Sequence, residues 1–218
     1  MPSEIIVVDH GTTTEEAAGH SGGSRGKGGD ILWRYGNPQV YRAATRKQQA
    51  LFCQHSANFI RDAPGAGNIM CFNNGSAPHR LWSTVDEIAL SDSAEEGVYV
   101  KEEGKPYMPD EPAWRHGPSA GRLGSFYCTH ISGAQRCPNG NTLITLGPQG
   151  IMVEVTPEHE EVWRYISPVM IHDTGVAFTR QGDQRVNARY SLFRALRYPP
   201  GCPALEGRDL SPGRSLEA

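Results

Sequence analysis

Residues 161–166 read Glu-Val-Trp-Arg-Tyr-Ile, and the Trp-Arg pair at their centre occurs twice more, earlier in the chain. Residues 31–36 read Ile-Leu-Trp-Arg-Tyr-Gly, and residues 112–117 read Pro-Ala-Trp-Arg-His-Gly. Alternation of apolar and polar side chains over six positions is typical of a strand with one buried face. The sequence therefore predicts a repeated strand whose tryptophan (Trp33, Trp114 or Trp163) lies in the core.

Each of these strands follows other strand-like runs. Residues 4–9, 84–90 and 151–156 directly precede the three Trp-Arg strands. Two further runs, residues 67–72 and 140–145, both begin Gly-Asn and continue with apolar side chains. Residues 54–60 and 131–136 come before those runs. The repeated unit is thus four antiparallel strands, with the Trp-Arg strand last.

A four-stranded repeat of roughly 40 residues is the signature of a β-propeller blade. We predict an all-β fold of antiparallel four-stranded blades in residues 1–198, with a C-terminal tail at 199–218. The blade strands fall within residues 4–36, 53–117, 130–166 and 171–194. These segments supply about 2.5 to 3 blades, whereas a propeller needs about four or more to close. Either the chain is the C-terminal part of a longer protein, which we expect, or it self-associates.

The composition agrees with many short strands. The chain holds 25 Gly and 16 Pro, which disfavour long helices. Only residues 41–52 look helical, and we predict a short connecting helix there. The formal net charge of −3 gives no basic footprint for nucleic acid, and no apolar run is long enough to span a membrane. None of the 5 cysteines forms a C-x-x-C pair, so we expect free thiols and no metal site, with a Cys53–Cys71 bridge as the alternative.

Four further segments carry a family resemblance. Residues 28–38 read Gly-Gly-Asp-Ile-Leu-Trp-Arg-Tyr-Gly-Asn-Pro, residues 54–57 Gln-His-Ser-Ala, residues 72–75 Phe-Asn-Asn-Gly, and residues 132–144 Ser-Gly-Ala-Gln-Arg-Cys-Pro-Asn-Gly-Asn-Thr-Leu-Ile. In this order they resemble the arylsulfotransferase family of PAPS-independent arylsulfate sulfotransferases. The resemblance runs from residue 4 to residue 212 and corresponds to the C-terminal half of a typical member.

The resemblance implies a six-bladed propeller with its active site in the central channel. Members move a sulfuryl group from a phenolic sulfate ester to a phenol through a sulfo-histidine, without a cofactor. It also suggests an extracytoplasmic location, although residues 1–10 are not a signal peptide. The competing hypothesis is a non-catalytic propeller module that binds ligands, or a truncated inactive fragment.

The resemblance also implies which residues form the site. His55, in the Gln-His-Ser-Ala motif, would be catalytic and accept the sulfuryl group, and His130 would be a second catalytic residue. Arg80, or its neighbour His79, would bind the sulfate. From the residues alone, His55 could equally be a hydrogen-bonded core histidine, and Arg80 an exposed loop arginine.

Three other features have simpler interpretations. Arg136 is expected to pack between blades or to stabilise a turn. His10 and His20 flank a glycine-rich segment that is either a plain loop or a cap on the channel mouth. The acidic residues Glu95, Glu96, Glu102 and Glu103 indicate a solvated loop rather than a calcium site.

Overall fold

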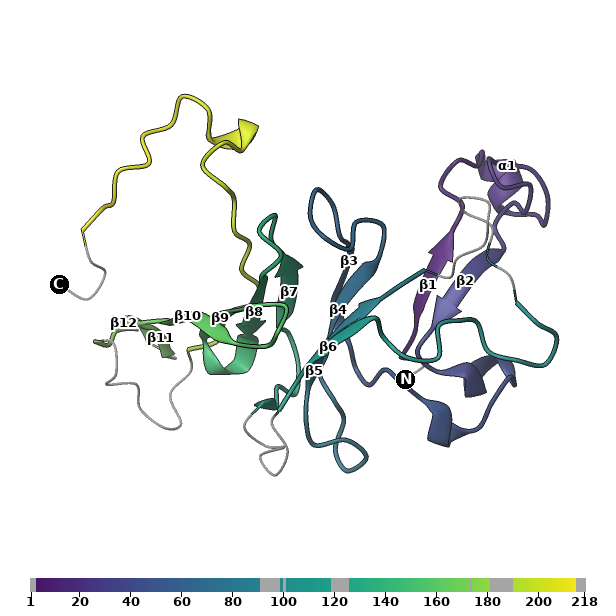
Figure 1. Ribbon diagram of the computed structural model, residues 1–218, viewed down its shortest axis with the longest axis horizontal. Helices are drawn as coiled ribbons and strands as arrows, with labels where there is room; N and C mark the ends of the chain where they lie inside the picture. Colours follow the sequence, from purple (N-terminus) through teal and green to yellow (C-terminus); the bar gives the residue numbers. More distant parts are fainter. Residues whose placement is uncertain are drawn as a thin grey trace.

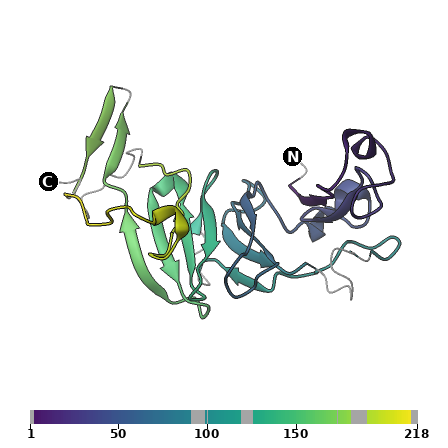
Figure 2. The ribbon, with the colours of Figure 1, turned by 90° about the horizontal axis from the view of Figure 1, so that it is seen from above.

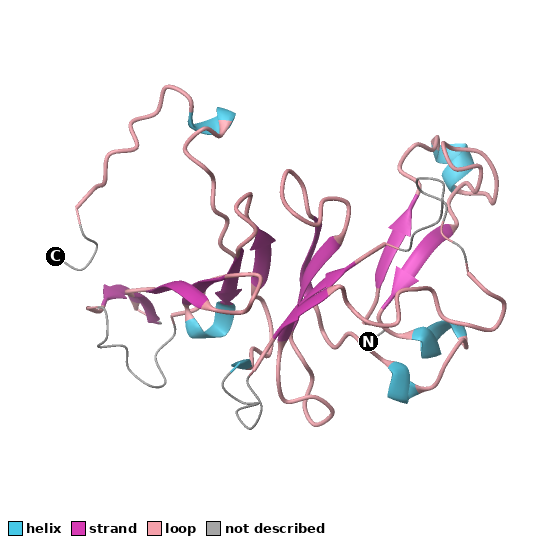
Figure 3. Cartoon of the chain, viewed as in Figure 1, coloured by secondary structure: helices cyan, strands magenta, loops and turns pink. Residues whose placement is uncertain are grey.

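The computed structural model describes residues 3–90, 99, 101–118, 126–172, 174–180 and 190–214. Nearly all of its regular structure is antiparallel sheet, as Figure 3 shows. The sheets lie in a row from β1–β2 to β11–β12, with two four-stranded sheets at the centre (Figures 1 and 2). The all-β prediction is therefore confirmed. No sheet closes on itself within the described part of the chain.

The first four-stranded sheet follows the predicted order. It consists of β3 (His55–Phe59), β4 (Ile69–Asn73), β5 (Thr84–Ile88) and β6 (Trp114–His116), paired in sequence order. Every residue of β4 and β5 is buried, because further sheets cover both faces. The Trp-Arg strand is last, as the repeat predicts.

The second four-stranded sheet has the same order. Its strands are β7 (Gly133–Arg136), β8 (Thr142–Leu146), β9 (Ile151–Val155) and β10 (Glu161–Ile166). One face packs against the first sheet through a core that includes Phe72 and Val85 on one side and Ile144 and Val153 on the other.

A two-stranded sheet covers the other face of the first sheet. It pairs β1 (Ile5–Val8) with β2 (Ile31–Tyr35). Trp33 and Tyr35 of β2 pack with Ile69 and Ile88 of the first sheet. Between β1 and β2, a short α-helix, α1 (Thr14–Ala17), begins with a capping box made by Thr13 and Glu16.

A second two-stranded sheet follows β10. It pairs β11 (Val169–His172) with β12 (Gly175–Phe178). The expected strand at 175–179 is confirmed, whereas most of the one expected at 186–193 lies outside the described residues. Its last part, residues 190–193, is not a strand. Beyond it, the segment 192–197 lies along the second sheet, where Arg197 N–H donates to Gln135 Oε1 (2.7 Å) and Ala195 N–H to Thr145 Oγ1 (3.1 Å).

One sequence prediction about local structure is wrong, and another holds only in part. Residues 41–52 form no α-helix but lie around two 3₁₀ turns, Pro38–Tyr41 and Arg46–Gln48. Arg42 adopts a left-handed conformation (φ 61°), which ends the first turn. Of the three tryptophans expected in the core, Trp33 is fully buried and Trp114 is partly buried against the core, whereas Trp163 is 39% exposed.

The five cysteines are free thiols, so the Cys53–Cys71 alternative is not realised. Burial raises the pKa of Cys71 well above its usual value and that of Cys128 to about 11, which keeps both as neutral thiols. No helix in the described residues is long and apolar enough to cross a membrane.

Candidate functional site

His55 begins β3 and is held by Asn74, which follows the end of β4. Its Nδ1 lies 2.8 Å from Asn74 Oδ1 and 3.1 Å from the Cys53 carbonyl oxygen. The Asn74 amide nitrogen donates to the carbonyl oxygens of Cys128 and Ile131, at 3.0 Å each, so Oδ1 is the atom that faces the imidazole. Both neighbours of Nδ1 are acceptors, which places the proton on Nδ1. The lone pair of the neutral ring is therefore on Nε2.

The backbone around this histidine is unusual. Cys53 (φ 53°), Ser56 (φ 57°), Ile131 (φ 47°) and Ser132 (φ 81°) all adopt left-handed conformations although none is glycine. The pairing of β3 with β4 also contains a bulge between His55 and Asn58. A β-branched residue such as Ile131 is rarely left-handed, and such residues persist where surrounding contacts impose them, often at functional sites.

His55, Asn74 and the two carbonyl groups that hold Asn74, of Cys128 and Ile131, form what we call the Asn74 node. His130 lies beside this node but is exposed. Its Nδ1 is 2.8 Å from Thr129 Oγ1, and its carbonyl oxygen accepts a hydrogen bond from Ser132 Oγ (3.3 Å). The next residue, Ile131, supplies one of the carbonyls that hold Asn74. The fold thus brings the loop of His130 to the residue that orients His55.

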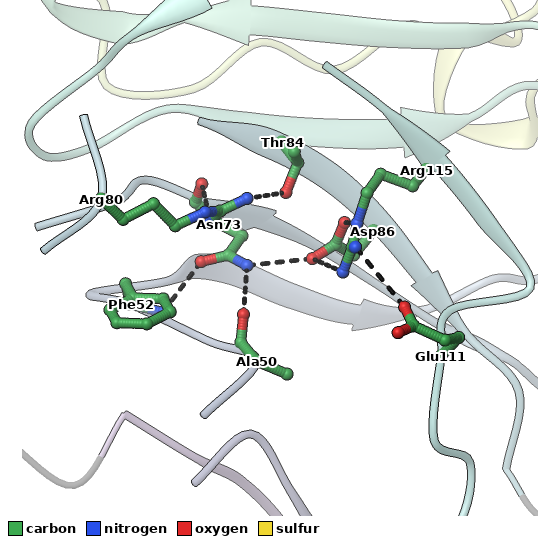
Figure 4. A network of polar contacts seen from close by, with 8 residues as sticks. All are labelled: Ala50, Phe52, Asn73, Arg80, Thr84, Asp86, Glu111 and Arg115. Atoms are coloured by element: carbon green, nitrogen blue, oxygen red, sulfur yellow. Dashed lines mark hydrogen bonds and ion pairs between the residues drawn. The ribbon is translucent and has the colours of Figure 1, made fainter. Parts of the chain in front are cut away.

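Arg80 is a buried cation rather than an exposed loop residue. Its side chain donates to Thr84 Oγ1 (2.8 Å) and to the Asn73 carbonyl oxygen (3.4 Å), as Figure 4 shows. The guanidinium lies over Trp82, 5.3 Å from the ring centroid. It forms no ion pair within the described residues, and only 6% of the residue is exposed. Burial lowers the pKa of Arg80 to about 10, which still leaves it charged at neutral pH.

A second network of hydrogen bonds and ion pairs lies next to Arg80, around the side chain of Asn73 (Figure 4). The Asn73 amide donates to the Ala50 carbonyl oxygen (2.9 Å) and to Asp86 Oδ2 (3.0 Å). Asp86 itself is paired with Arg115, whose Nε lies 2.7 Å from Oδ1. Asp86 forms its ion pair with Arg115 and none with Arg80, although its nearby charge favours the charged form of Arg80.

Arg80 and His79 line the larger of two neighbouring cavities, which has a volume of about 540 Å³. Its wall is rich in aromatic rings and also carries both signs of charge; the lining includes Tyr35, Tyr41, Lys47, Phe52, Trp82, Tyr107, Asp110, Glu111 and Arg115. A cavity of this size and lining accommodates a molecule of one or two rings. A buried arginine at its wall favours an anionic group on that molecule.

His79 also lines the smaller cavity of about 280 Å³, together with Cys53 and Arg46. One of its ring nitrogens, Nε2, lies 2.5 Å from Arg46 Nη2. His55 and His130 line neither cavity. The structure therefore separates the predicted residues into a cavity group, Arg80 and His79, and a node around Asn74 that contains His55, with the exposed His130 beside it.

Consecutive residues join these two groups. The carbonyl of Asn73 accepts from Arg80, and the side chain of Asn74 orients His55. Sequence analysis did not assign a role to Asn74, although it lies within the Phe-Asn-Asn-Gly motif at 72–75. It also missed Tyr41 and Tyr107, which come from connecting segments without regular patterning.

The structure also places the other charged residues and histidines that the sequence analysis named. Arg136 packs between the two sheets, as expected, where it pairs with Glu87. His20 binds Asp30, with 2.7 Å between Nδ1 and Oδ1. Glu102 and Glu103 are exposed, whereas Glu95 and Glu96 lie outside the described residues. Among the residues that are described, no three His, Cys, Asp or Glu side chains gather as metal ligands.

Comparisons with protein-family models, with curated proteins and with solved structures find no match to this chain.

Proposed function

We propose that the chain forms blades of a β-propeller and carries a sulfuryl-transfer site of the arylsulfate sulfotransferase type. Two sheets of identical strand order, packed face to face, support the propeller arrangement. In this arrangement β3 and β7 are the inner strands, so the node of His55 and Asn74 lies beside the central channel.

The observation that carries the proposed activity is the orientation of His55. Asn74 fixes the proton on Nδ1, so that Nε2 has a free lone pair in the neutral ring. A neutral imidazole with an oriented lone pair is a competent nucleophile toward sulfur. An exposed histidine without such a partner would sample both tautomers and many rotamers.

In the proposed cycle, His55 Nε2 attacks the sulfur of an aryl sulfate. The N–S bond forms as the S–O bond to the aryl oxygen breaks, and its electron pair leaves on the phenolate. The oxygen of an acceptor phenol then attacks the same sulfur, and the N–S pair returns to Nε2. His130 gives a proton to the leaving aryl oxygen in the first step, so a neutral phenol is released, and takes the proton of the acceptor phenol in the second step, which restores His130.

Arg80 and the aromatic cavity supply the proposed recognition of the substrate. The guanidinium offers a fixed charge to the sulfate oxygens, and Trp82 and Tyr107 offer ring faces to the aryl group. This assignment follows the residue types of the cavity, where Arg80 is buried among aromatic rings and forms no ion pair with a described residue.

The test is the release of p-nitrophenol from p-nitrophenyl sulfate with phenol as acceptor. We expect turnover by the wild type, a loss of about 100-fold or more in His55→Ala, and no change in His10→Ala, a histidine outside the site. Equal rates in the wild type and His55→Ala would overturn the role of His55.

The second candidate function is binding of aromatic anions without transfer. The observation that favours it is that His55 does not line the cavity of Arg80. Calorimetry with p-nitrophenyl sulfate separates the two: binding that Arg80→Gln weakens, without any turnover, supports the binding module.

A further inference from the structure

Two histidines face each other across the boundary between the two four-stranded sheets. His116 ends β6 of the first sheet, and His159 lies in the turn between β9 and β10 of the second. Their Nδ1 atoms are 3.4 Å apart, and their ring centroids are 5.5 Å apart. Because the two nitrogens are closer together than the two centroids, each Nδ1 lies on the side of its ring that faces the other histidine.

Trp114 of β6 holds both imidazole rings in place. Its ring is stacked on His116, with 6.0 Å between centroids, and on His159, with 5.2 Å between centroids. Its Nε1 also donates to the Pro157 carbonyl oxygen (2.9 Å), which ties the turn of His159 to β6. Within that turn, the N–H of His159 donates to the Thr156 carbonyl oxygen (3.0 Å). The two nitrogens are therefore positioned by contacts of the protein itself.

The spacing of these nitrogens suits a metal ion better than a hydrogen bond. N–H donors usually lie about 2.7–3.2 Å from their acceptors, so 3.4 Å is long for a hydrogen bond between the rings. A zinc ion binds imidazole nitrogen at about 2.0–2.1 Å, and tetrahedral angles then place two such nitrogens about 3.3–3.4 Å apart. The observed separation of the two Nδ1 atoms is thus that of two ligands of one tetrahedral ion.

The surroundings of the pair also favour a bound cation. Burial, and then His159, lower the pKa of His116 to about 4, so this ring is neutral at pH 7 and no proton competes with a metal ion for its lone pair. The negative charge of Glu161 acts on His116 in the direction that favours a cation. His159 is exposed, so water can reach the space beside its ring and complete the coordination of an ion.

We propose that Nδ1 of His116 and Nδ1 of His159 bind one divalent ion of the class that prefers nitrogen ligands, such as Zn²⁺, with water in the remaining positions. No third His, Cys, Asp or Glu of the described residues joins the pair, so the ion binds more weakly than in a four-ligand structural site and exchanges with solution. The ion links β6 to the turn between β9 and β10 and so stabilises the contact between the two sheets. This site is separate from the proposed sulfuryl transfer.

The test is calorimetric titration of the EDTA-treated, dialysed 218-residue chain with ZnCl₂ at pH 7.5. We expect the wild type to bind a Zn²⁺ ion whose dissociation constant rises about tenfold or more in His159→Gln, because one of its two protein ligands is lost. His20→Gln is the matched control, since the side chain of His20 is 89% exposed and lies beside Asp30, away from the pair. Zinc bound by thiols is common to all variants and cancels in the comparison. MgCl₂ should give no binding at the pair, because Mg²⁺ prefers oxygen ligands.

Two further readouts identify the ligands and the effect on stability. Nitrogen-15 NMR of the histidine rings should show zinc-dependent shifts of Nδ1 in His116 and His159. Zinc should also raise the urea midpoint of the wild type and of His20→Gln, but not that of His159→Gln. Equal zinc affinity in the wild type and His159→Gln, or zinc shifts confined to other histidines, overturns the proposal. Circular dichroism confirms that the variants fold, and no measurement needs turnover, so a failure here is separate from a failure of sulfuryl transfer.

Discussion

Arg136 at the end of β7 pairs with Glu87 of β5 and so joins the two four-stranded sheets by a buried ion pair. Nη2 of Arg136 lies 2.5 Å from Glu87 Oε2, and both side chains are at most 9% exposed. The guanidinium also lies over Trp114, 4.6 Å from its ring centroid. Arg197 repeats this arrangement on the second sheet, where it pairs with Glu154 and lies 5.0 Å from the centroid of Trp163.

Glu87→Gln should lower the free energy of unfolding by about 3–5 kcal/mol, because it leaves the Arg136 charge buried without a carboxylate. Urea unfolding measures the change. Glu161→Gln is the matched control, since its pair with Arg164 is about 40% exposed on each side and should contribute at most about 1 kcal/mol. Equal losses in the two variants would contradict the importance of burial.

Asn74→Ala should abolish most of the proposed sulfuryl transfer while leaving His55 in the chain. The reason is that the imidazole loses the acceptor that fixes its tautomer. Nitrogen-15 NMR of the histidine ring should show Nδ1 protonated in the wild type and a tautomer mixture in Asn74→Ala. A wild-type ring protonated mainly on Nε2 would refute this account. Thermal melts distinguish a loss of orientation from a loss of folding.

Stability should fall in mild acid because of His116. Burial, and then the neighbouring His159, lower the pKa of His116 to about 4. The unfolded chain takes up the proton near pH 6.5, so the stability present above that pH is lost as the pH falls from about 6.5 to 4. We expect a loss of about 1–2 kcal/mol, discounted for partial exposure. Denaturation at pH 7.5 and pH 4.5 should show a smaller difference in His116→Gln than in the wild type.

Tyr35→Phe should leave stability unchanged or raise it by up to about 1 kcal/mol. The Tyr35 hydroxyl is buried and has no hydrogen-bond partner among the described residues, so its removal relieves a desolvation cost. Burial also raises the pKa of this phenol, which therefore stays protonated. A loss above 1 kcal/mol in urea unfolding would indicate that the hydroxyl has a partner.

The strands could be predicted from the sequence because their signals are local. The alternation of apolar and polar side chains predicted the Trp-Arg strands, and the apolar runs that begin with Gly-Asn predicted β4 and β8. The pairing order followed from short turns such as residues 157–160. The helix predicted at 41–52 is wrong. Its composition favours a helix, but Arg42 adopts a left-handed conformation and the segment forms two 3₁₀ turns instead.

The candidate site could be predicted only as a set of residue types. His55 and Arg80 were named from motifs, yet nothing in the local sequence shows that Arg80 is buried with its guanidinium over Trp82 or that His55 has a partner.

The sequence by itself determined most of the strands in the two four-stranded sheets and which strand ends each repeat, because side-chain alternation acts over a few neighbouring residues. Tertiary structure alone decided the chemistry of the site. Asn74 is anchored by carbonyls more than 50 positions away, at Cys128 and Ile131, and only the packing of two sheets brings those groups together. The orientation of an imidazole is thus set by long-range hydrogen bonds that no local pattern encodes.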